Sequence, residues 1–225
     1  VISEAHKNGA KVFCDVTNLD HALKVQDLGA DGVIAVGVGA GGHAGPISPL
    51  VLIPWLSKKL EILVIAAGGV GDGSTIAACL SLGASGVSIG TRFIASHEAE
   101  VDIAYKKAIV DSSPEDIVMT TKISGTPASV INTEFVQKSG LDLPFLLKYL
   151  KTNKLTKKYM VPIIHLAGMK ALQNSAEGTT WKTVWSAGQT VGLIDEILSC
   201  SEIMDRLVKE YHQARESLPS VLTNH

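Results

Sequence analysis

The candidate functional residues of this 225-residue chain lie in three glycine-rich turns. They span residues 37–45, 66–73 and 89–93, and each directly follows a short apolar segment. Glycine in such turns allows positive φ and leaves backbone N–H groups open to a ligand that lies close. A helix that begins just after the turn adds its positive end, which attracts phosphate. One such turn would indicate only a tight bend, whereas three in succession predict a site for a phosphorylated ligand.

His43 lies in the first of these turns, where no bulky neighbour in the sequence would bury it. Its imidazole can accept or donate a proton near neutral pH, which suits general acid–base work on a weakly acidic substrate. A histidine on a loop is more often an ordinary surface residue, but its place within Gly-Gly-His favours a catalytic role. The other histidines have no such setting, and no pair of them has ligand spacing with a carboxylate. We therefore expect no metal site.

The secondary structure expected around these turns repeats one unit along the first 95 residues or so: a helix, Gly-Ala, a short apolar strand and a turn. The strands are expected at residues 11–15, 32–37, 62–67 and 86–90. They are apolar on both faces, as in a sheet that helices cover. Repeated strand–helix units predict parallel strands joined by right-handed crossovers. Either a doubly wound sheet or a (β/α)8 barrel satisfies that pattern.

The four expected strands amount to half of an eight-stranded barrel, which typically needs about 250 residues. The chain also starts at Val1, inside an expected helix, so we expect that an N-terminal part is missing. Residues 1–100 would then be the C-terminal half of a TIM-type (β/α)8 barrel with its active-site loops. Residues 101–225 would be a mainly helical extension or lid that completes the barrel, with β-prone segments within residues 117–131.

The composition is that of an ordinary enzyme without a nucleic-acid or membrane partner. Lys and Arg (20) are slightly outnumbered by Asp and Glu (22), so no basic patch is expected. Apolar runs such as residues 63–67 are far too short to cross a bilayer, and no signal peptide is visible. The three cysteines are far apart and form neither a disulfide framework nor a metal spacing. They favour a cytoplasmic location.

The three turns, in this order, resemble the signature of the nitronate monooxygenase (2-nitropropane dioxygenase-like) family. The matching segments are Ala-Gly-Gly-His-Ala-Gly at residues 40–45, Val-Ile-Ala-Ala-Gly-Gly at residues 64–69 with Asp72-Gly73, and Ile-Gly-Thr-Arg-Phe at residues 89–93. Residues 105–110 and 185–189 also look like family segments, so the resemblance covers essentially the whole chain. It implies a TIM-type barrel that holds FMN non-covalently.

The resemblance also implies roles for individual residues. His43 would be the active-site base or a hydrogen-bond donor to the substrate. The residues assigned to the cofactor are Gly41 and Gly42 against the flavin, and Gly68, Gly69, Gly90 and Thr91 around its phosphate. Family members oxidise alkyl nitronates with dioxygen to a carbonyl compound and nitrite, and some also take neutral nitroalkanes. The expected partners are therefore a nitronate or nitroalkane and dioxygen, and a homodimer is left open.

Two segments depart from the best-known family members. Where these show Gln-Gly-x-Glu before the histidine turn, this chain has Val-Gly-Val-Gly at residues 36–39. Where they often have Glu-Ser, it has Glu98-Ala99. Both changes put the substrate in doubt more than the cofactor. We also expect residues 1–225 alone to bind FMN poorly, since half a barrel leaves an open strand edge.

Three other interpretations stay open at this point. An FMN-dependent enoyl-acyl-carrier-protein reductase, or another NAD(P)H-dependent flavin oxidoreductase, would share the barrel and the Gly-Gly-His turn. Ala40, where those reductases tend to carry Ser, weighs mildly against that reading. A flavin-free barrel could use the same turns for the phosphate of a metabolite. A binding module without turnover would have no need of the imidazole of His43.

Overall fold

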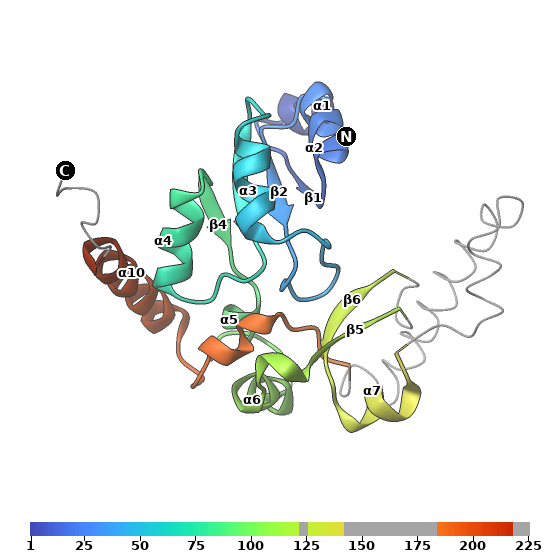
Figure 1. Cartoon of the computed structure of the whole chain (residues 1–225), viewed down its shortest axis with the longest axis vertical. Helices are drawn as coiled ribbons and strands as arrows, with labels where there is room; N and C mark the ends of the chain where they lie inside the picture. The colour runs from blue at the N-terminus through green and yellow to red at the C-terminus, as the bar shows by residue number, and fades with distance from the viewer. Residues whose placement is uncertain (122–125, 142–183, 218–225) are drawn as a thin grey trace, which may run out of the picture.

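The computed structural model describes residues 1–121, 126–141 and 184–217. Its centre is a parallel sheet in the order β1-β2-β3-β4, and these strands span Phe13–Val16, Gly32–Val36, Leu63–Ala67 and Gly86–Ser88. The register places Val33 opposite Val64 and Ile65 opposite Gly86. Because all four strands run the same way, their C-terminal ends lie along one edge of the sheet (Figure 1).

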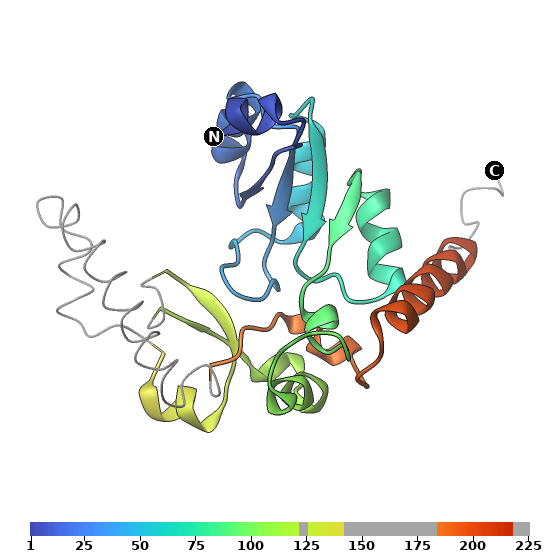
Figure 2. The same cartoon turned by 180° about the vertical axis from the view of Figure 1, so that it is seen from behind.

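The strands are connected by α2 (Leu19–Asp27), α3 (Pro49–Ser57) and α4 (Gly73–Ser81), and a short α1 (Ile2–Lys7) precedes β1. Two of these connecting helices begin at capping residues that the sequence supplies. The side chain of Asn18 accepts the N–H of His21, and that of Asp72 accepts the N–H of Thr75 at 2.7 Å. Figure 2 views the sheet from the side opposite α3 and α4, so these helices lie on one face.

The main core lies between this face and the helices. Leu52 and Leu56 of α3 are fully buried and pack with Val33 of β2 and Val64 of β3. A neighbouring cluster under α4 contains Ile53, Ala66, Val70, Cys79 and Ala84. Apolar residues at helical spacing therefore meet the apolar residues of the strands, as the sequence predicts. The parallel sheet with covering helices is confirmed.

The chain after β4 forms a second group of elements, most of which lie beyond the C-terminal edge of the sheet, while the last helix lies beside α4 (Figure 1). They are α5 (Thr91–Ile94), α6 (Ile103–Asp111), η1 (Pro114–Asp116), β5 (Ile117–Thr120), β6 (Ala128–Ile131), α7 (Glu134–Ser139), η2 (Gln189–Leu193) and α10 (Cys200–Ser217). Strands β5 and β6 pair antiparallel, and α10 packs along α4. The strands expected within residues 117–131 are thus present. Of the helices expected from residue 144 onward, those before residue 184 lie outside the described residues.

The sheet is open in the part of the chain that the structure describes. β1 and β4 each pair with a strand on one side only, so closure into a barrel is not shown. No helix among the described residues is long and apolar enough to cross a membrane. The described residues also contain no cluster of three or more histidine, cysteine or acidic side chains that could hold a metal ion.

The buried face of α3 leads to a stability prediction. We expect Leu52→Ala to lower the free energy of unfolding by about 2–5 kcal/mol, because it leaves a cavity between α3 and the sheet. The matched control is Leu50→Ala on the same helix, where the side chain is 68% exposed and the change should stay within about 0.5 kcal/mol. Urea denaturation measures both. Equal shifts of the two midpoints would contradict this packing.

Candidate functional site

A cavity of about 400 Å³ lies where the four parallel strands end. Strand β2 shows on which face it lies. Val33 and Ala35 belong to the core under the helices, whereas Ile34 and Val36 line the cavity. Alternate side chains of a strand point to opposite faces of the sheet. The cavity is therefore on the face that α2 and α3 do not cover.

This cavity brings together every residue for which the sequence suggests a role. The turns after β2, β3 and β4 contribute to its wall in succession, because parallel strands deliver their following turns to the same edge. The residues concerned are Gly41, Gly42, His43, Gly68, Gly69, Gly90 and Thr91. The roles of these residues in binding a ligand stay predictions. Those roles require that the residues line the same cavity, and they do.

The turn that carries His43 is held by backbone hydrogen bonds from three directions. Gly37 N–H donates to the carbonyl of Ala67, at the end of β3, at 2.9 Å. Gly42 and Ser129 of β6 exchange two bonds: Gly42 N–H to Ser129 O at 3.1 Å, and Ser129 N–H to Gly42 O at 2.7 Å. Gln189 N–H donates to the carbonyl of Gly39 at 3.0 Å. The turn is therefore a fixed part of the wall.

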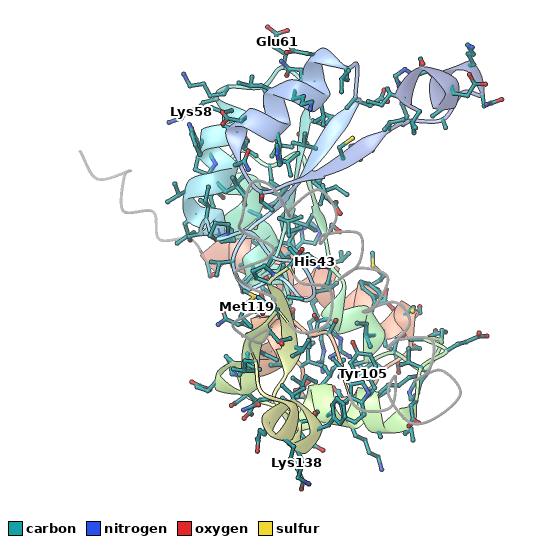
Figure 3. The ribbon with its side chains drawn as sticks, turned by 90° about the vertical axis from the view of Figure 1, so that its right-hand side faces the viewer. His43, Lys58, Glu61, Tyr105, Met119 and Lys138 are labelled. Carbon is teal, nitrogen blue, oxygen red and sulfur yellow. The ribbon has the colours of Figure 1, made fainter. Side chains whose placement is uncertain are left out.

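His43 itself is exposed and lines the cavity. Figure 3 shows it near the middle of the molecule, between the parallel sheet and the β5–β6 hairpin. This position leaves the imidazole accessible to a substrate that enters the cavity from solvent. A proton exchanged with a substrate can pass on to water from there.

Gly41 is required by packing inside the protein. A Cβ atom on it would lie 2.9 Å from the carbonyl carbon of Ala187 and 2.9 Å from the nitrogen of Gly188. A Cβ atom on Gly188 would lie 2.4 Å from the carbonyl oxygen of Gly39. Two backbones thus approach each other with no space for a side chain. The glycine at position 41 has this structural reason whatever ligand the cavity takes.

The glycines of the second and third turns serve two different purposes. Gly68 has φ +89°, and a Cβ atom there would lie 2.8 Å from the carbonyl oxygen of Gly37, so it makes the tight turn. A Cβ atom on Gly69 or Gly90 would meet nothing within 4 Å. These two positions leave an open stretch of cavity wall formed by backbone. The wall fits a phosphate group that backbone N–H groups bind at close range.

The expected contribution of the helix after the second turn is not available to a ligand. Helix α4 begins beside this turn, but two carboxylates of the chain already occupy its N-terminus. Asp72 accepts the N–H of Thr75 at 2.7 Å, and Glu210 of α10 accepts the N–H of Gly73 at 2.9 Å. These groups neutralise the positive end of the helix. Any attraction for phosphate at this turn must come from the glycine backbone.

Thr91 joins the third turn to the segment that returns from the C-terminal part. Its side chain is buried, and its Oγ1 accepts the N–H of Gly188 at 3.0 Å. The hydroxyl hydrogen can still be donated to a ligand. Thr91 therefore has a structural role that the sequence did not reveal, in addition to the predicted one.

The cavity also contains residues that the sequence reasoning missed. Asp15, on β1, is exposed in its lining, and it ends a predicted strand, which is a position where barrel enzymes place functional side chains. That signal could have identified it. Ser186 and Thr190 also line the cavity. They arrive from far along the chain, and nothing in their spacing could have placed them there.

Tyr105 and Trp185 hold the segment that carries Ser186. Their rings stack with centroids 5.6 Å apart and an interplanar angle of 9°. The Tyr105 hydroxyl donates a hydrogen bond to the carbonyl oxygen of Ser186. Burial raises the pKa of Tyr105 to about 12, so the phenol keeps its proton and this bond over the physiological pH range. The cavity wall near residues 186–188 is thereby ordered by an aromatic pair.

Comparisons with known proteins identify the family to which the chain belongs. The sequence profile of the nitronate monooxygenase family matches residues 1–210. The chain is 32% identical over 234 residues to the nitronate monooxygenase of Paraburkholderia phytofirmans. This match covers 97% of this chain and 59% of that protein. It is 30% identical over 236 residues to a Rhodococcus jostii protein named (3aS,4S,5R,7aS)-5-hydroxy-7a-methyl-1-oxo-octahydro-1H-indene-4-carboxyl-CoA dehydrogenase, with 93% and 67% covered.

A solved structure also resembles this chain over almost its whole length. FabK from Thermotoga maritima superimposes with a TM-score of 0.78 and 35% sequence identity, covering 96% of this chain and 66% of that one. The chain thus spans about two thirds or less of the length of each of these relatives. The profile match over nearly all of the chain shows that it belongs to the nitronate monooxygenase family, a family of flavin-dependent oxidoreductases.

Proposed function

We propose that the whole protein is an FMN-dependent monooxygenase that oxidises alkyl nitronates or nitroalkanes with dioxygen, giving a carbonyl compound and nitrite. The observation that carries this proposal is the single cavity that gathers His43 and the three glycine turns at the C-terminal edge of a parallel sheet. Active sites of (β/α) barrels lie at that edge. The similarity to the Paraburkholderia nitronate monooxygenase supports the reaction. The proposal includes a cytoplasmic location.

The proposal extends to the fold of the whole protein. Residues 1–100 supply the C-terminal half of a TIM-type (β/α)8 barrel, and residues 101–225 are the extension that completes it. Two observations support this. Strands β1 and β4 have a neighbour on one side only among the described residues, and both would be paired in a closed barrel. The relatives that match are also longer than this chain.

The residues present fit FMN. Gly69 and Gly90 form a stretch of wall without side chains, where backbone N–H groups and the Thr91 hydroxyl would hold the phosphate. Gly42, with φ +67° and no atom within 4 Å of a Cβ built on it, would allow the flavin ring to lie against the histidine turn, with Gly41 beside it. When bound, FMN supplies a two-electron acceptor for the substrate and a reductant for dioxygen.

The protein's own side chains then have defined tasks. The imidazole of His43 removes the proton from the α-carbon of a neutral nitroalkane, or donates a hydrogen bond to an oxygen of a nitronate. The apolar side chains of Ile34, Val36 and Ile94 line the same cavity and suit an alkyl chain.

A second candidate function is an NAD(P)H-dependent flavin oxidoreductase, such as an enoyl-acyl-carrier-protein reductase. The Rhodococcus relative favours it, since that protein is named a dehydrogenase of a CoA compound. Membership of a family of flavin-dependent enzymes leaves the flavin-free barrel and the binding module without support.

The two candidate flavin-dependent functions differ in the compound that reduces the cofactor: a nitronate in one and NAD(P)H in the other. We expect the visible spectrum of the full-length protein to bleach under anaerobic conditions when an alkyl nitronate is added, and to persist when NADH is added. Rapid bleaching by NADH alone would assign the protein to the reductases. A colourless protein that takes up no FMN would overturn the flavin assignment.

A base at His43 is needed for a neutral nitroalkane but not for a nitronate, which has already lost its α-proton. We expect His43→Gln to lower kcat/KM for a neutral nitroalkane by about 10²–10⁴-fold, since a general base contributes that much. The loss should be much smaller for the preformed nitronate, which has no α-proton to remove. His21→Gln, at an exposed histidine on α2, is the matched control. Equal losses for both substrates would show that His43 does not act as a base.

The space beside Gly90 is the place that we propose for the phosphate of FMN, and a larger side chain at this position tests that proposal. Gly90→Leu should weaken FMN binding by about tenfold or more, because its side chain occupies the space proposed for the phosphate and displaces a charge-assisted contact. The fold should tolerate it, since the backbone φ is −104° and no atom lies within 4 Å of the added Cβ. Ser85→Leu, exposed just before β4, is the control. Fluorescence titration with FMN measures both, and unchanged affinity in Gly90→Leu would place the phosphate elsewhere.

A further inference from the structure

Asp15 lines the cavity at the ends of the parallel strands (the first cavity), and the proposed function gives it no task. It lies on β1, and the parallel register places it opposite Ile34 of β2. Residues paired in this way point to the same face of a sheet, and Ile34 lines the cavity too. Val16, the next residue of β1, belongs to the core under the helices on the other face. The side chain of Asp15 therefore faces the first cavity.

The carboxylate of Asp15 has no partner in the part of the chain that the structure describes. No residue there donates a hydrogen bond to it or forms an ion pair with it. Ile34 and Val36, which line the cavity from the neighbouring strand, are aliphatic and have no side-chain donor. An ionised carboxylate only accepts hydrogen bonds. A ligand that displaces water from Asp15 must therefore bring donors of its own, or it binds more weakly.

Asp15 lies far from the wall that we propose for the phosphate of FMN. That wall follows β3 and β4, whereas Asp15 is on β1, at the opposite edge of the four-stranded sheet (Figure 1). Three strand spacings separate β1 from β4, which is roughly 14 Å along the sheet. The carboxylate therefore does not oppose the phosphate at close range.

The turn that carries His43 reaches the same side of the cavity as Asp15. It starts at β2 and returns beside the end of β1, where a Cβ atom on Gly45 would lie 2.8 Å from the Cβ atom of Thr17. Thr17 is two residues beyond Asp15 in the chain. A substrate held at His43 therefore lies on the side of the cavity that Asp15 lines.

The charges of this cavity favour one kind of substrate. Its described lining contains no lysine or arginine that could neutralise the carboxylate of Asp15. A second carboxylate, on the alkyl part of a substrate, would be repelled there. A hydroxyl or an ammonium group would instead donate a charge-assisted hydrogen bond to Asp15.

We propose that Asp15 determines substrate specificity: it selects a substrate whose alkyl part carries a hydrogen-bond donor, a hydroxyl or an ammonium group, over one that is purely aliphatic or carries a carboxylate. The reacting nitro group of this substrate rests on the proposed function, and Asp15 adds the class of group at its other end. A site that hydrogen-bonds a polar group of its substrate rejects the analogue that lacks it, because the polar group of the site then stays unpaired.

Steady-state kinetics of the full-length, flavin-loaded protein with four nitroalkanes test this role. Each compound carries a nitro group at one end of its chain. At the other end, nitropropanol and nitropropylammonium have a donor, nitrobutane has a methyl group, and nitrobutanoate has a carboxylate. The wild-type protein should show a higher kcat/KM for the two donor-bearing compounds than for nitrobutane, and the lowest kcat/KM for nitrobutanoate.

Asp15→Leu should lower kcat/KM for the two donor-bearing compounds, relative to nitrobutane, by about tenfold or more, because a charge-assisted hydrogen bond is lost. Asp15→Asn keeps an acceptor without the charge, so nitropropylammonium should lose more than nitropropanol. Asp15→Asn also decides if the leucine variant fails to fold. Asp27→Leu, at an exposed residue of α2 outside the cavity lining, is the matched control and should keep every ratio.

Unchanged ratios in the folded Asp15 variants would overturn the proposal, and so would a wild-type preference for nitrobutane or nitrobutanoate. Fluorescence titration with FMN accompanies the kinetics. Weaker FMN binding in Asp15→Leu, with the substrate ratios unchanged, would assign Asp15 to the cofactor and overturn the proposal as well.

If the protein turns over none of these compounds, the proposed function fails, and binding decides the role of Asp15. Calorimetric titration with propylammonium and with propanoate compares a cation with an anion of similar size. Tighter binding of the cation, lost in Asp15→Leu and kept in Asp27→Leu, supports selection by the carboxylate. Equal affinities for the two ions overturn it.

Discussion

The close contact between two backbones, at residues 39–41 and residues 187–189, is the constraint on which the first cavity depends. Gln189 N–H donates to the carbonyl of Gly39, and Gly188 N–H donates to Oγ1 of Thr91. One short segment thus ties the turn after β2 to the turn after β4. Only glycine allows this approach, since a Cβ atom on Gly188 would lie 2.4 Å from the Gly39 oxygen. Without it, the wall between the two turns would be open.

Two cavities in the described part of the chain differ in their electrostatics. In the described lining of the first cavity, Asp15 and His43 are the ionisable residues, and the rest is glycine, aliphatic or hydroxyl-bearing. Such a wall suits a planar aromatic cofactor and an alkyl substrate, with one group to exchange protons. A second cavity, of about 300 Å³ beside α10, is lined by two arginines, Arg92 and Arg206, and by three carboxylates, Asp72, Asp195 and Glu210.

Local patterns in the sequence predict the parallel sheet, because each unit of helix, Gly-Ala, strand and turn is contained within a few tens of residues. They predict that His43 and the glycines of the three turns meet, since parallel strands place their following turns at one edge. The α4 N-terminus shows where such reasoning fails. Its predicted attraction for phosphate is cancelled by Glu210, which lies 137 residues away from Gly73 in the chain. No local pattern could indicate that contact.

Local sequence patterns predict the helices, the strands, the three turns and the position of His43, because these depend on backbone preferences and on the spacing of apolar residues. Which glycines leave space for a ligand, and which are required by packing, depends on contacts between distant segments. Gly41 is closed off by Ala187, whereas Gly90 faces open space, although both occur in similar turns. In the same way, two donors of Arg92 are left without an acceptor among the described residues. The physical reason is the same in each case: steric contact and hydrogen-bond satisfaction depend on atoms from distant segments.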